Sequence, residues 1–407
     1  MNKTIKCPKA PDKLKAISSK SEVHRLLIAA ALSDKTTRIK CESINEDIRA
    51  TAGCLQSLGA RISYTDSSFT VEPITDPPEN PELFCNESGS TLRFLLPLAA
   101  FYGKGCAFVT EGRLALRPLS PLKEELEKSG CIIKTEEKKI TISGKCTENA
   151  FRIPGNVSSQ FISGLLFMLT KTGGKIIITE AVESRPYIEM TIDVLRKFGC
   201  KIDFTDNEIT IEKTCPLVSP LNTDSFGDWS NAAFFLSAGV IGKEKITVTG
   251  LDINSKQGDK KIIDILCSAG AKIDINGNEI TAHPSVLHSF STDASDTPDL
   301  VPVLTVVAAN AEGTTKIYGC SRLRIKESDR IESVVKMITA LGGKICADDD
   351  CIIVEGYPLS GGIVSSENDH RIAMSAAVAA FGTKNEITIE NAQAVNKSYP
   401  SFWDEIR

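Results

Sequence analysis

The chain has 407 residues, of which 42% are hydrophobic and 24% are charged, and its formal net charge is −5. This composition is typical of a globular protein of about two to three domains, and so mild a charge argues against a nucleic-acid or membrane-surface partner. The polar N-terminus and the lack of an apolar run near ~18 residues predict a cytoplasmic protein without a signal peptide or a membrane span.

Cysteine and histidine usage gives no indication of a metal site. The 13 cysteines include no C-x-x-C pair, and the four histidines have no spacing of the H-E-x-x-H kind. Scattered cysteines in a large chain more often act as small buried hydrophobes in a reducing compartment. We therefore expect neither a metal nor another cofactor.

Six polar helix starts, each followed by an apolar helix, recur along the chain. The expected helices cover residues 18–32, 87–100, 158–169, 230–241, 299–311 and 369–381. Their polar anchors follow one another at roughly 70-residue steps, and these anchors are Ser19, Ser88, Ser158, Ser230, Asp299 and Asp369.

A second pattern, a helix end of the form L-x-x-x-G followed by alternating strands, keeps the same period. Its glycines, which we expect to end helices, are Gly59, Gly130, Gly199, Gly270 and Gly342. Five complete α/β units fit the chain, and a sixth begins at Asp369 and runs out of residues. The N-terminal segment could supply the missing strand, which would make the two termini neighbours.

Six such units in about 400 residues suit two domains of three units each. If the N-terminal strand completes the last unit, one domain is discontinuous, with chain crossings near residues 15–20 and 220–228. The segment 215–228, with two prolines and polar helix-start residues, fits the second crossing. We therefore expect a domain of residues 1–17 plus 225–407 and an inserted domain of residues 18–224.

Cations accompany several of the helix starts. A helix N-terminus offers free N–H groups and a positive dipole end, which suit phosphate or carboxylate. Any single start is explained as well by ordinary capping, because Ser and Asp are common N-caps. Six starts in phase, several with Lys or Arg in the first turns, favour the binding of small anions.

The segment 321–331 is the densest basic stretch of the chain. If it is helical, Lys326 and Arg330 are i,i+4 neighbours whose repulsion an anion would relieve. A solvated charged face is an equally good interpretation of this segment alone. Two carboxylates are candidates for proton transfer, although Glu327 could be only an ion-pair partner and Asp299 only an N-cap.

The chain lacks a P-loop, a dinucleotide fingerprint and a G-x-S-x-G motif, which argues against nucleotide hydrolysis, hydride transfer and esterase chemistry. Its motifs resemble those of the 5-enolpyruvylshikimate-3-phosphate (EPSP) synthase family over essentially the whole length. The matching motifs are, in order, SKSEVHR, ESGSTLR, LRP, VSSQF, SRPY, TPD, RIKESDR, NDHRIAM and NKSYP.

The resemblance implies an α/β fold of two domains, each an inside-out barrel of three βαβαββ units, with the active site in the cleft between them. It implies transfer of the enolpyruvyl group of phosphoenolpyruvate to the 5-hydroxyl of shikimate-3-phosphate, in the shikimate pathway. The partners would be these two small molecules, and the family suggests a monomer.

Roles are implied for the positions that match the family motifs. Asp299, Glu327 and Lys20 would be the catalytic residues, with Asp299 taking the proton of the attacking hydroxyl. Shikimate-3-phosphate would be bound by Lys20, Ser21, Arg25, Ser158, Ser159, Gln160, Ser184, Asp299 and Lys326. Phosphoenolpyruvate would be bound by Lys20, Gly89, Arg117, Gln160, Arg330, Arg371 and Lys397.

Glu87, Arg322 and Arg185 depart from the family pattern, and Glu87 has a carboxylate where many members have the side-chain amide of Asn. A related alternative is a UDP-N-acetylglucosamine enolpyruvyl transferase, which carries a K-N pair in its first helix where this chain reads SKSEVHR. An alternative of another class is a non-catalytic anion-binding protein, which would not need Asp299 or Glu327.

Overall fold

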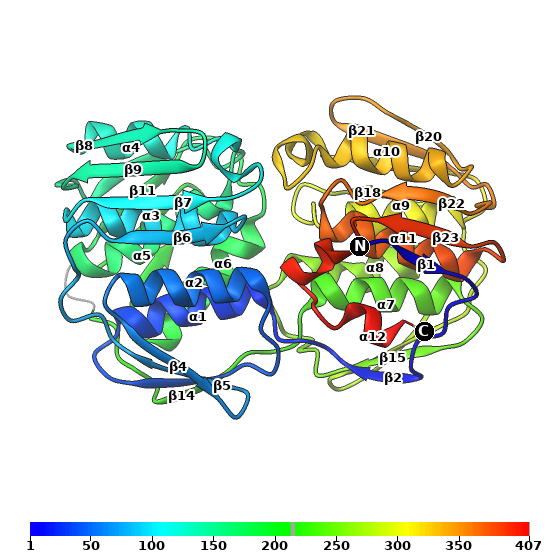
Figure 1. Ribbon diagram of the computed structural model, residues 1–407, viewed down its shortest axis with the longest axis horizontal. Coiled ribbons are helices and arrows are strands. Elements are labelled where there is room, and N and C mark those ends of the chain that lie inside the picture. Colours follow the sequence, from blue (N-terminus) through cyan, green and yellow to red (C-terminus); the bar gives the residue numbers. More distant parts are fainter. Residues whose placement is uncertain (213–215, 407) are drawn as a thin grey trace. The chain divides into compact units, whose positions relative to one another are not determined.

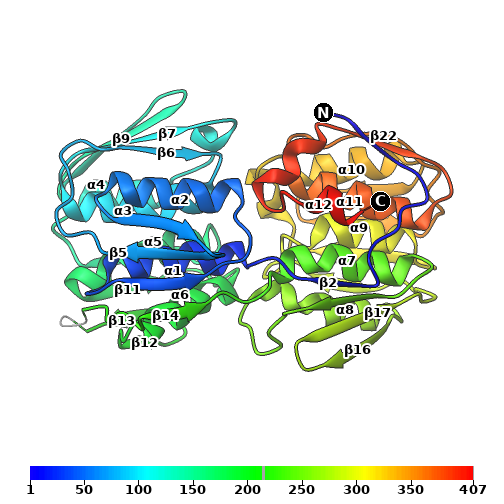
Figure 2. The same cartoon turned by 60° about the horizontal axis from the view of Figure 1, so that its bottom comes forward.

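The computed structural model describes residues 1–212 and 216–406, and its chain divides into two compact units. One unit is continuous, Ser18–Ser225, and we call it the inserted unit. The other combines Met1–Ile17 with Phe226–Arg407, and we call it the terminal unit. Figures 1 and 2 show the elements of each unit from two directions.

Three four-stranded sheets with one topology make up the strands described in the inserted unit. In each sheet the first two strands of the order below are parallel and the other pairings are antiparallel. The orders are β14 (Asn222–Asp224), β3 (Thr37–Lys40), β5 (Ser68–Glu72), β4 (Arg61–Thr65); β6 (Glu82–Asn86), β7 (Cys106–Thr110), β9 (Lys139–Gly144), β8 (Cys131–Thr135); and β10 (Ala150–Ile153), β11 (Gly174–Ile178), β13 (Glu208–Ile211), β12 (Ile202–Phe204).

The terminal unit repeats this topology, with one shorter sheet. Its orders are β16 (Lys272–Asn276), β17 (Glu279–His283), β15 (Ile246–Thr249), β2 (Lys13–Lys15); β18 (Ser291–Asp293), β19 (Thr314–Tyr318), β21 (Cys351–Glu355), β20 (Lys344–Ala347); and β1 (Lys3–Ile5), β23 (Ile387–Glu390), β22 (Gly362–Ser365).

Helices alternate with the strands in both units. In the inserted unit they are α1 (Lys20–Leu32), α2 (Glu46–Ser57), α3 (Gly89–Tyr102), η1 (Leu114–Leu116), α4 (Leu122–Lys128), α5 (Ser159–Thr172) and α6 (Arg185–Lys197). In the terminal unit they are α7 (Trp229–Ile241), η2 (Gly258–Lys261), α8 (Ile262–Ser268), α9 (Val301–Ala309), η3 (Ser321–Ile325), α10 (Arg330–Ala340), α11 (His370–Ala379), η4 (Ala380–Gly382), η5 (Ala392–Lys397) and α12 (Phe402–Glu405).

The first residues of the chain complete two sheets of the terminal unit. Strand β2 runs parallel to β15, with Leu14 opposite Val248, and β1 runs antiparallel to β23, with Lys3 opposite Ile389. The Met1 amino group also donates a hydrogen bond of 2.9 Å to the Gln393 side chain. The last, incomplete repeat therefore takes its antiparallel strand from the N-terminus.

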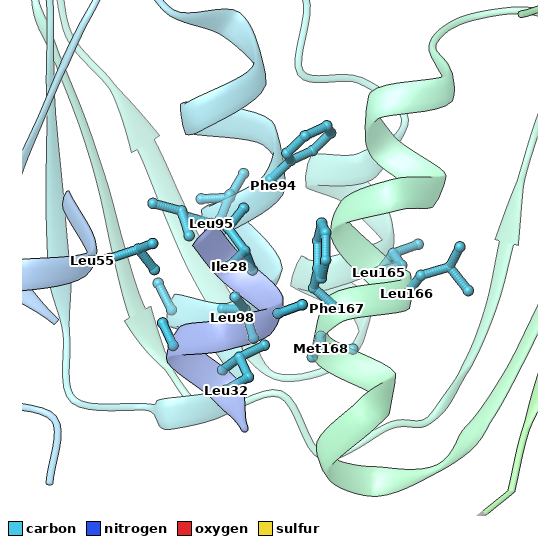
Figure 3. Close-up of a cluster of buried hydrophobic side chains, with 14 of the residues drawn as sticks. Ile28, Leu32, Leu55, Phe94, Leu95, Leu98, Leu165, Leu166, Phe167 and Met168 are labelled. Atoms are coloured by element: carbon cyan, nitrogen blue, oxygen red, sulfur yellow. The ribbon is translucent and has the colours of Figure 1, made fainter. Parts of the chain in front are cut away.

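One helix of each repeat is buried on all sides, because its sequence is apolar all around. In the inserted unit these helices are α1, α3 and α5. In α1, for example, every residue from Val23 to Leu32 is buried. Phe94 of α3 and Phe167 of α5 pack with ring centroids 5.7 Å apart. Figure 3 shows this core, to which α1, α2, α3 and α5 contribute Ile28, Leu32, Leu55, Phe94, Leu95, Leu98, Leu165, Leu166, Phe167 and Met168.

Helices α7, α9 and α11 are the corresponding buried helices of the terminal unit. Each fully buried Leu, Ile or Phe side chain contributes about 1.5–3 kcal/mol, so these central helices dominate the stability of both units. Helices thus lie inside and sheets outside, and the N-termini of the helices become the places where polar groups can collect. Within residues 1–212 and 216–406, no helix is long and apolar enough to cross a bilayer.

Candidate active site

Four of the six predicted anchors are N-caps with a side-chain hydrogen bond. Ser19, Ser88, Ser158 and Asp369 accept from backbone N–H groups in the first turns of α1, α3, α5 and α11. Each of these side chains satisfies one of the free N–H groups that a helix start leaves. The polar residues of these starts are therefore held at the positive ends of buried helices.

The other two anchors are wrong by one or two residues. Helix α7 is capped by Asp228, whose carboxylate accepts from the backbone N–H of Ser230, so Ser230 lies inside the first turn. Helix α9 begins at Val301 after Leu300, without a side-chain cap. The Asp299 carboxylate instead accepts from two arginines, because a charged guanidinium is a stronger partner than a backbone N–H.

Arg330 gathers three carboxylates in the terminal unit. Its Nη1 donates to Asp299 at 2.6 Å, its Nη2 to Glu327 at 2.7 Å and its Nε to Asp369 at 2.8 Å. The Arg330 side chain is 1% exposed and that of Asp369 is fully buried. Arg371 donates from Nη2 to Asp299 at 2.8 Å, so two arginines hold the one carboxylate.

This arrangement shifts the proton affinities of its members. Burial alone would raise the pKa of Asp299, but the charges of Arg371, Arg330 and Lys326 outweigh it and hold that pKa well below its usual range. Burial would likewise lower the pKa of Arg330, but Asp369, Glu327 and Asp299 keep it well above its ordinary value. At neutral pH Asp299 is therefore an anion and Arg330 is a cation.

The basic segment is not one helix, so the condition for an i,i+4 relation of Lys326 and Arg330 is not met. The η3 turn ends at Ile325, Lys326 has extended backbone, and α10 starts only at Arg330. Asp329 caps α10 by accepting from the backbone N–H of Glu332 at 3.1 Å, and a capping residue needs an extended backbone.

Two lysines belong to the same part of the terminal unit. Burial lowers the pKa of Lys326 to about 8, and the nearby charges of Arg322 and Arg330 add to the effect while Asp299 opposes it. Lys397 is buried and donates from Nζ to the backbone oxygen of Asn368 at 2.7 Å, next to the capping Asp369. The structure thus places all six predicted residues of this unit around α10, α11 and η5.

Arg25 is the buried cation of the inserted unit. It is 3% exposed and donates from Nε to the Thr191 hydroxyl at 2.7 Å, from Nη1 to the Ser21 carbonyl at 2.6 Å and from Nη2 to the Tyr187 carbonyl at 2.9 Å. Its guanidinium carbon also lies 5.0 Å from the centroid of the Phe94 ring. Burial lowers the pKa of Arg25 to about 10, so it stays cationic at neutral pH.

Gly89, the first residue of α3, faces two more guanidinium groups. A Cβ built on Gly89 would lie 2.7 Å from Nη1 of Arg93 and 2.9 Å from Nη1 of Arg117. Arg93 donates to the Gln160 Oε1 at 2.8 Å, and Gln160 donates from Nε2 to the Ser90 hydroxyl at 3.0 Å. The structure therefore brings the starts of α3 and α5 and two arginines into one polar cluster.

The remaining predicted residues lie at helix starts of the inserted unit. Lys20 is the first residue of α1 and pairs with Asp47 at 2.9 Å, with both side chains about 15% exposed or less. Ser159 is the buried first residue of α5. Ser184 precedes α6 with φ of 55°, a left-handed conformation that non-glycine residues rarely adopt and that often marks functional sites.

The sequence marks Arg93 as a cation near a helix start but gives it no specific ligand, and it gives no role to the carboxylate of Asp369. Arg93 lies four residues after Gly89 and so on the same face of α3. The dual contact of Asp369 with Arg330 and with the start of α11 depends on two segments about 40 residues apart, which spacing does not reveal. Among the described residues, no three His, Cys, Asp or Glu side chains are grouped so as to hold a metal ion.

Comparisons with known proteins show the family of the chain. A family model described as EPSP synthase (3-phosphoshikimate 1-carboxyvinyltransferase) matches residues 9–406. The chain is 41% identical to the 3-phosphoshikimate 1-carboxyvinyltransferase of Clostridium novyi, covering 95% of this chain and 92% of the relative. It is 40% identical to the enzyme of that name from Clostridium kluyveri, with 99% and 96% covered.

Solved structures give the same result. The EPSP synthase of Acinetobacter baumannii superposes with a TM-score of 0.81 at 25% identity, covering 100% of this chain and 99% of that one. The enolpyruvyl transferase NikO of Streptomyces tendae, at 20% identity and a TM-score of 0.77, shares the fold. The α/β fold class and the family predicted from the motifs are confirmed, and the chain belongs to the EPSP synthase (3-phosphoshikimate 1-carboxyvinyltransferase) family.

Proposed function

We propose that this chain transfers the enolpyruvyl group of phosphoenolpyruvate to the 5-hydroxyl of shikimate-3-phosphate and releases phosphate. It is then a 1-carboxyvinyl transferase of the EC 2.5.1.19 class in the shikimate pathway, on the route to chorismate and the aromatic amino acids. The family match and the names of the relatives support this reaction. The observation that carries the proposal is a carboxylate, Asp299, held between two buried arginines.

Two multiply charged anions must meet in this reaction, so the protein has to offset their repulsion with cations. Shikimate-3-phosphate is assigned to Lys20, Ser21, Arg25, Ser158, Ser159, Gln160, Ser184, Asp299 and Lys326. Phosphoenolpyruvate is assigned to Lys20, Gly89, Arg117, Gln160, Arg330, Arg371 and Lys397. Arginine suits these roles because its planar fork matches a carboxylate or a phosphate with two parallel hydrogen bonds.

Asp299 is assigned as the base that takes the proton of the 5-hydroxyl. Because two arginines depress its pKa, it is ionised before substrates bind, but it is then a weak base. A substrate carboxylate bound to Arg330 and Arg371 would compete for the same N–H groups. The pKa of Asp299 would then rise toward the range in which it can accept a proton, so substrate binding would prepare the base.

The remaining proton steps need an acid for the methylene carbon of phosphoenolpyruvate, a role we give to Glu327 together with Lys20. Protonation of that carbon makes the adjacent carbon electrophilic, and the 5-hydroxyl oxygen bonds to it. Removal of a proton from the new methyl group then forms the double bond again while the bond to phosphate breaks. The steps balance in protons and electrons and use acid–base and electrostatic catalysis.

The test is the exchange of Asp299 for Asn, which keeps size and one acceptor oxygen. We expect turnover, measured as phosphate released from the two substrates, to fall by about 10²–10⁴-fold. Binding of shikimate-3-phosphate, measured by calorimetry, should change only a few-fold. Asp264→Asn, on the exposed face of α8, is the matched control and should leave turnover unchanged. Turnover within tenfold of the parent protein would refute the assignment.

The same assay separates the alternatives. Phosphate release with UDP-N-acetylglucosamine and none with shikimate-3-phosphate would identify the related transferase instead. A non-catalytic anion-binding protein would release no phosphate with either acceptor, and Asp299→Asn would then alter no rate.

We further propose that the protein acts as a monomer in the cytoplasm. The cysteines that the structure describes are thiols, and most are buried, which is typical of proteins in a reducing compartment. Light scattering at micromolar concentration tests the first point, and the mass of a dimer would contradict it.

A further inference from the structure

Arg25 differs from Arg330 in the partners that hold it. All three of its hydrogen bonds go to neutral oxygens, namely two carbonyls and one hydroxyl. Within residues 1–212 and 216–406, no carboxylate forms a direct ion pair with it, although the charge of Glu22 acts on it from a longer distance. A buried charge without a directly bound counter-charge is costly, so this guanidinium has a strong tendency to attract an anion.

A guanidinium has five N–H donors, and Arg25 uses one on each of its three nitrogens. One donor therefore remains on Nη1 and one on Nη2, which together can form a bidentate contact with a carboxylate or a phosphate. Their direction is set by the partners of the other three donors. Two of those partners are backbone oxygens, and the third, at Nε, is the only side chain among them, Thr191.

The hydroxyl of Thr191 has all its hydrogen-bonding capacity in use. It donates its proton to the Tyr187 carbonyl of its own helix at 3.1 Å, and it accepts from Arg25 Nε at 2.7 Å. The Ser163 hydroxyl lies 2.7 Å from the same oxygen. Either hydroxyl can be the donor in that pair, and Ser163 is the donor when the Thr191 proton is given to Tyr187. Both hydroxyl residues are fully buried.

This chain of hydrogen bonds joins three helices. Ser163 belongs to α5, Thr191 to α6 and Arg25 to α1, and the bond from Arg25 to Thr191 has one direction because a guanidinium can only donate. The Nε edge of the Arg25 fork is therefore held by α5 and α6, which do not carry the charge themselves. Preorganisation of this kind removes the cost of ordering a long side chain when a ligand binds.

We propose that Thr191, supported by Ser163, is a positioning residue for shikimate-3-phosphate. It holds the Nε edge of Arg25 so that the two remaining donors point at an anionic group of the substrate. This inference rests on the proposed function, since it takes the substrate of Arg25 from there. Thr191 itself does not touch the substrate, and its effect is expected on binding rather than on the chemical step.

The test compares Thr191→Val, which keeps the shape and removes the hydroxyl, with Thr191→Ser, which keeps the hydroxyl. We expect Thr191→Val to raise the dissociation constant and the KM of shikimate-3-phosphate roughly ten- to a hundredfold, the usual range for a lost hydrogen bond to a charged group. The kcat at saturating substrate and the KM of phosphoenolpyruvate should stay within about threefold. Thr191→Ser should restore binding to within a few-fold.

Thr170→Val is the matched control, because Thr170 is a buried threonine of α5 whose hydroxyl bonds only to the Phe167 carbonyl of its own helix, at 2.7 Å. It should leave both KM values unchanged. If Thr191→Val does not fold, Ser163→Ala replaces it, and a KM of shikimate-3-phosphate raised about two- to fivefold is then expected. An unchanged KM in the folded variant, or an equal fall of kcat and kcat/KM, would overturn the inference.

The activity of the unmutated protein distinguishes a failure of the proposed function from a failure of the positioning role of Thr191. If it releases no phosphate from shikimate-3-phosphate and phosphoenolpyruvate, the proposed function fails before any variant is made. If the parent is active and Thr191→Val behaves like Thr170→Val, only the positioning role is lost.

Discussion

Replacing Arg330 with Met should destabilise the terminal unit strongly. The change removes a guanidinium that is 1% exposed and leaves the carboxylates of Asp299, Glu327 and Asp369 facing one another. Asp369 is fully buried, and removing one partner of a buried ion pair typically costs about 3–5 kcal/mol. Since folded domains have only about 5–15 kcal/mol of stability, most of the variant's margin would be lost.

Urea unfolding followed by tryptophan fluorescence is the suitable assay. The chain has two tryptophans, Trp229 and Trp403, and both belong to the terminal unit, so the signal reports that unit alone. Arg324→Met is the matched control, because Arg324 pairs with Asp329 and Asp349 at the surface, where ion pairs contribute little. Adding Asp369→Asn to Arg330→Met should recover part of the loss, because Asn still caps a helix but carries no charge.

The pH dependence gives a second measurement on the same variant. The pKa of Asp299 is depressed in the folded protein, so its contribution is present above the unfolded pKa and is lost as pH falls below about 4. The difference between Arg330→Met and the parent should therefore shrink in acid. A loss below about 1 kcal/mol at pH 7, or one no larger than that of Arg324→Met, would refute this account of the cluster.

Two further predictions concern the inserted unit. Burial, together with the charges of Lys20 and Arg25, holds the pKa of His24 well below its usual range. The free energy of unfolding should therefore fall by up to about 1.4 kcal/mol per pH unit as the pH drops below about 6.5. His24→Asn should flatten this slope in unfolding followed by circular dichroism, and equal slopes in the two proteins would contradict the assignment. Gly89→Ala should raise the KM of phosphoenolpyruvate about tenfold, because the added Cβ would meet the guanidinium groups of Arg93 and Arg117. Gly53→Ala is the control and should leave this KM unchanged, because a Cβ at Gly53 would have no atom within 4 Å. Equal effects of the two changes would exclude the steric cause.

The repeat period of the sequence predicts most of the helix starts and helix ends of the fold. All five glycines predicted to end helices have positive φ, between 77° and 102°. A strand follows each of them, either directly or after one or two linking residues. Four of six helix starts were placed on the capping residue itself. These features are local, because a cap and a glycine turn are decided by a few neighbouring residues, and local rules repeated along a chain reinforce one another.

The predictions that failed were also instructive. Asp228 rather than Ser230 caps α7, since both are good capping residues and only the packing of the first turn selects one. The helical case considered for Lys326 does not apply, because η3 ends at Ile325 and Asp329 caps a new helix. The hydrogen bonds of Arg25 with Thr191, about 166 residues away in sequence, depend on the docking of α1 against α6, which no short motif encodes.

The pairing of β1 with β23, near the end of the chain, has a consequence for the order of folding during synthesis. The inserted unit is complete once Ser225 has left the ribosome, whereas the terminal unit waits for the 182 residues that follow (407 − 225). At about 5–20 residues per second, that wait lasts roughly 9 to 36 seconds. Strand β15, the partner of β2, is made early in this wait, but β23, the partner of β1, is made near its end. For most of the wait β1 is therefore an unpaired edge strand, and lysines such as Lys3 and Lys6 disfavour the pairing of such an edge with other chains.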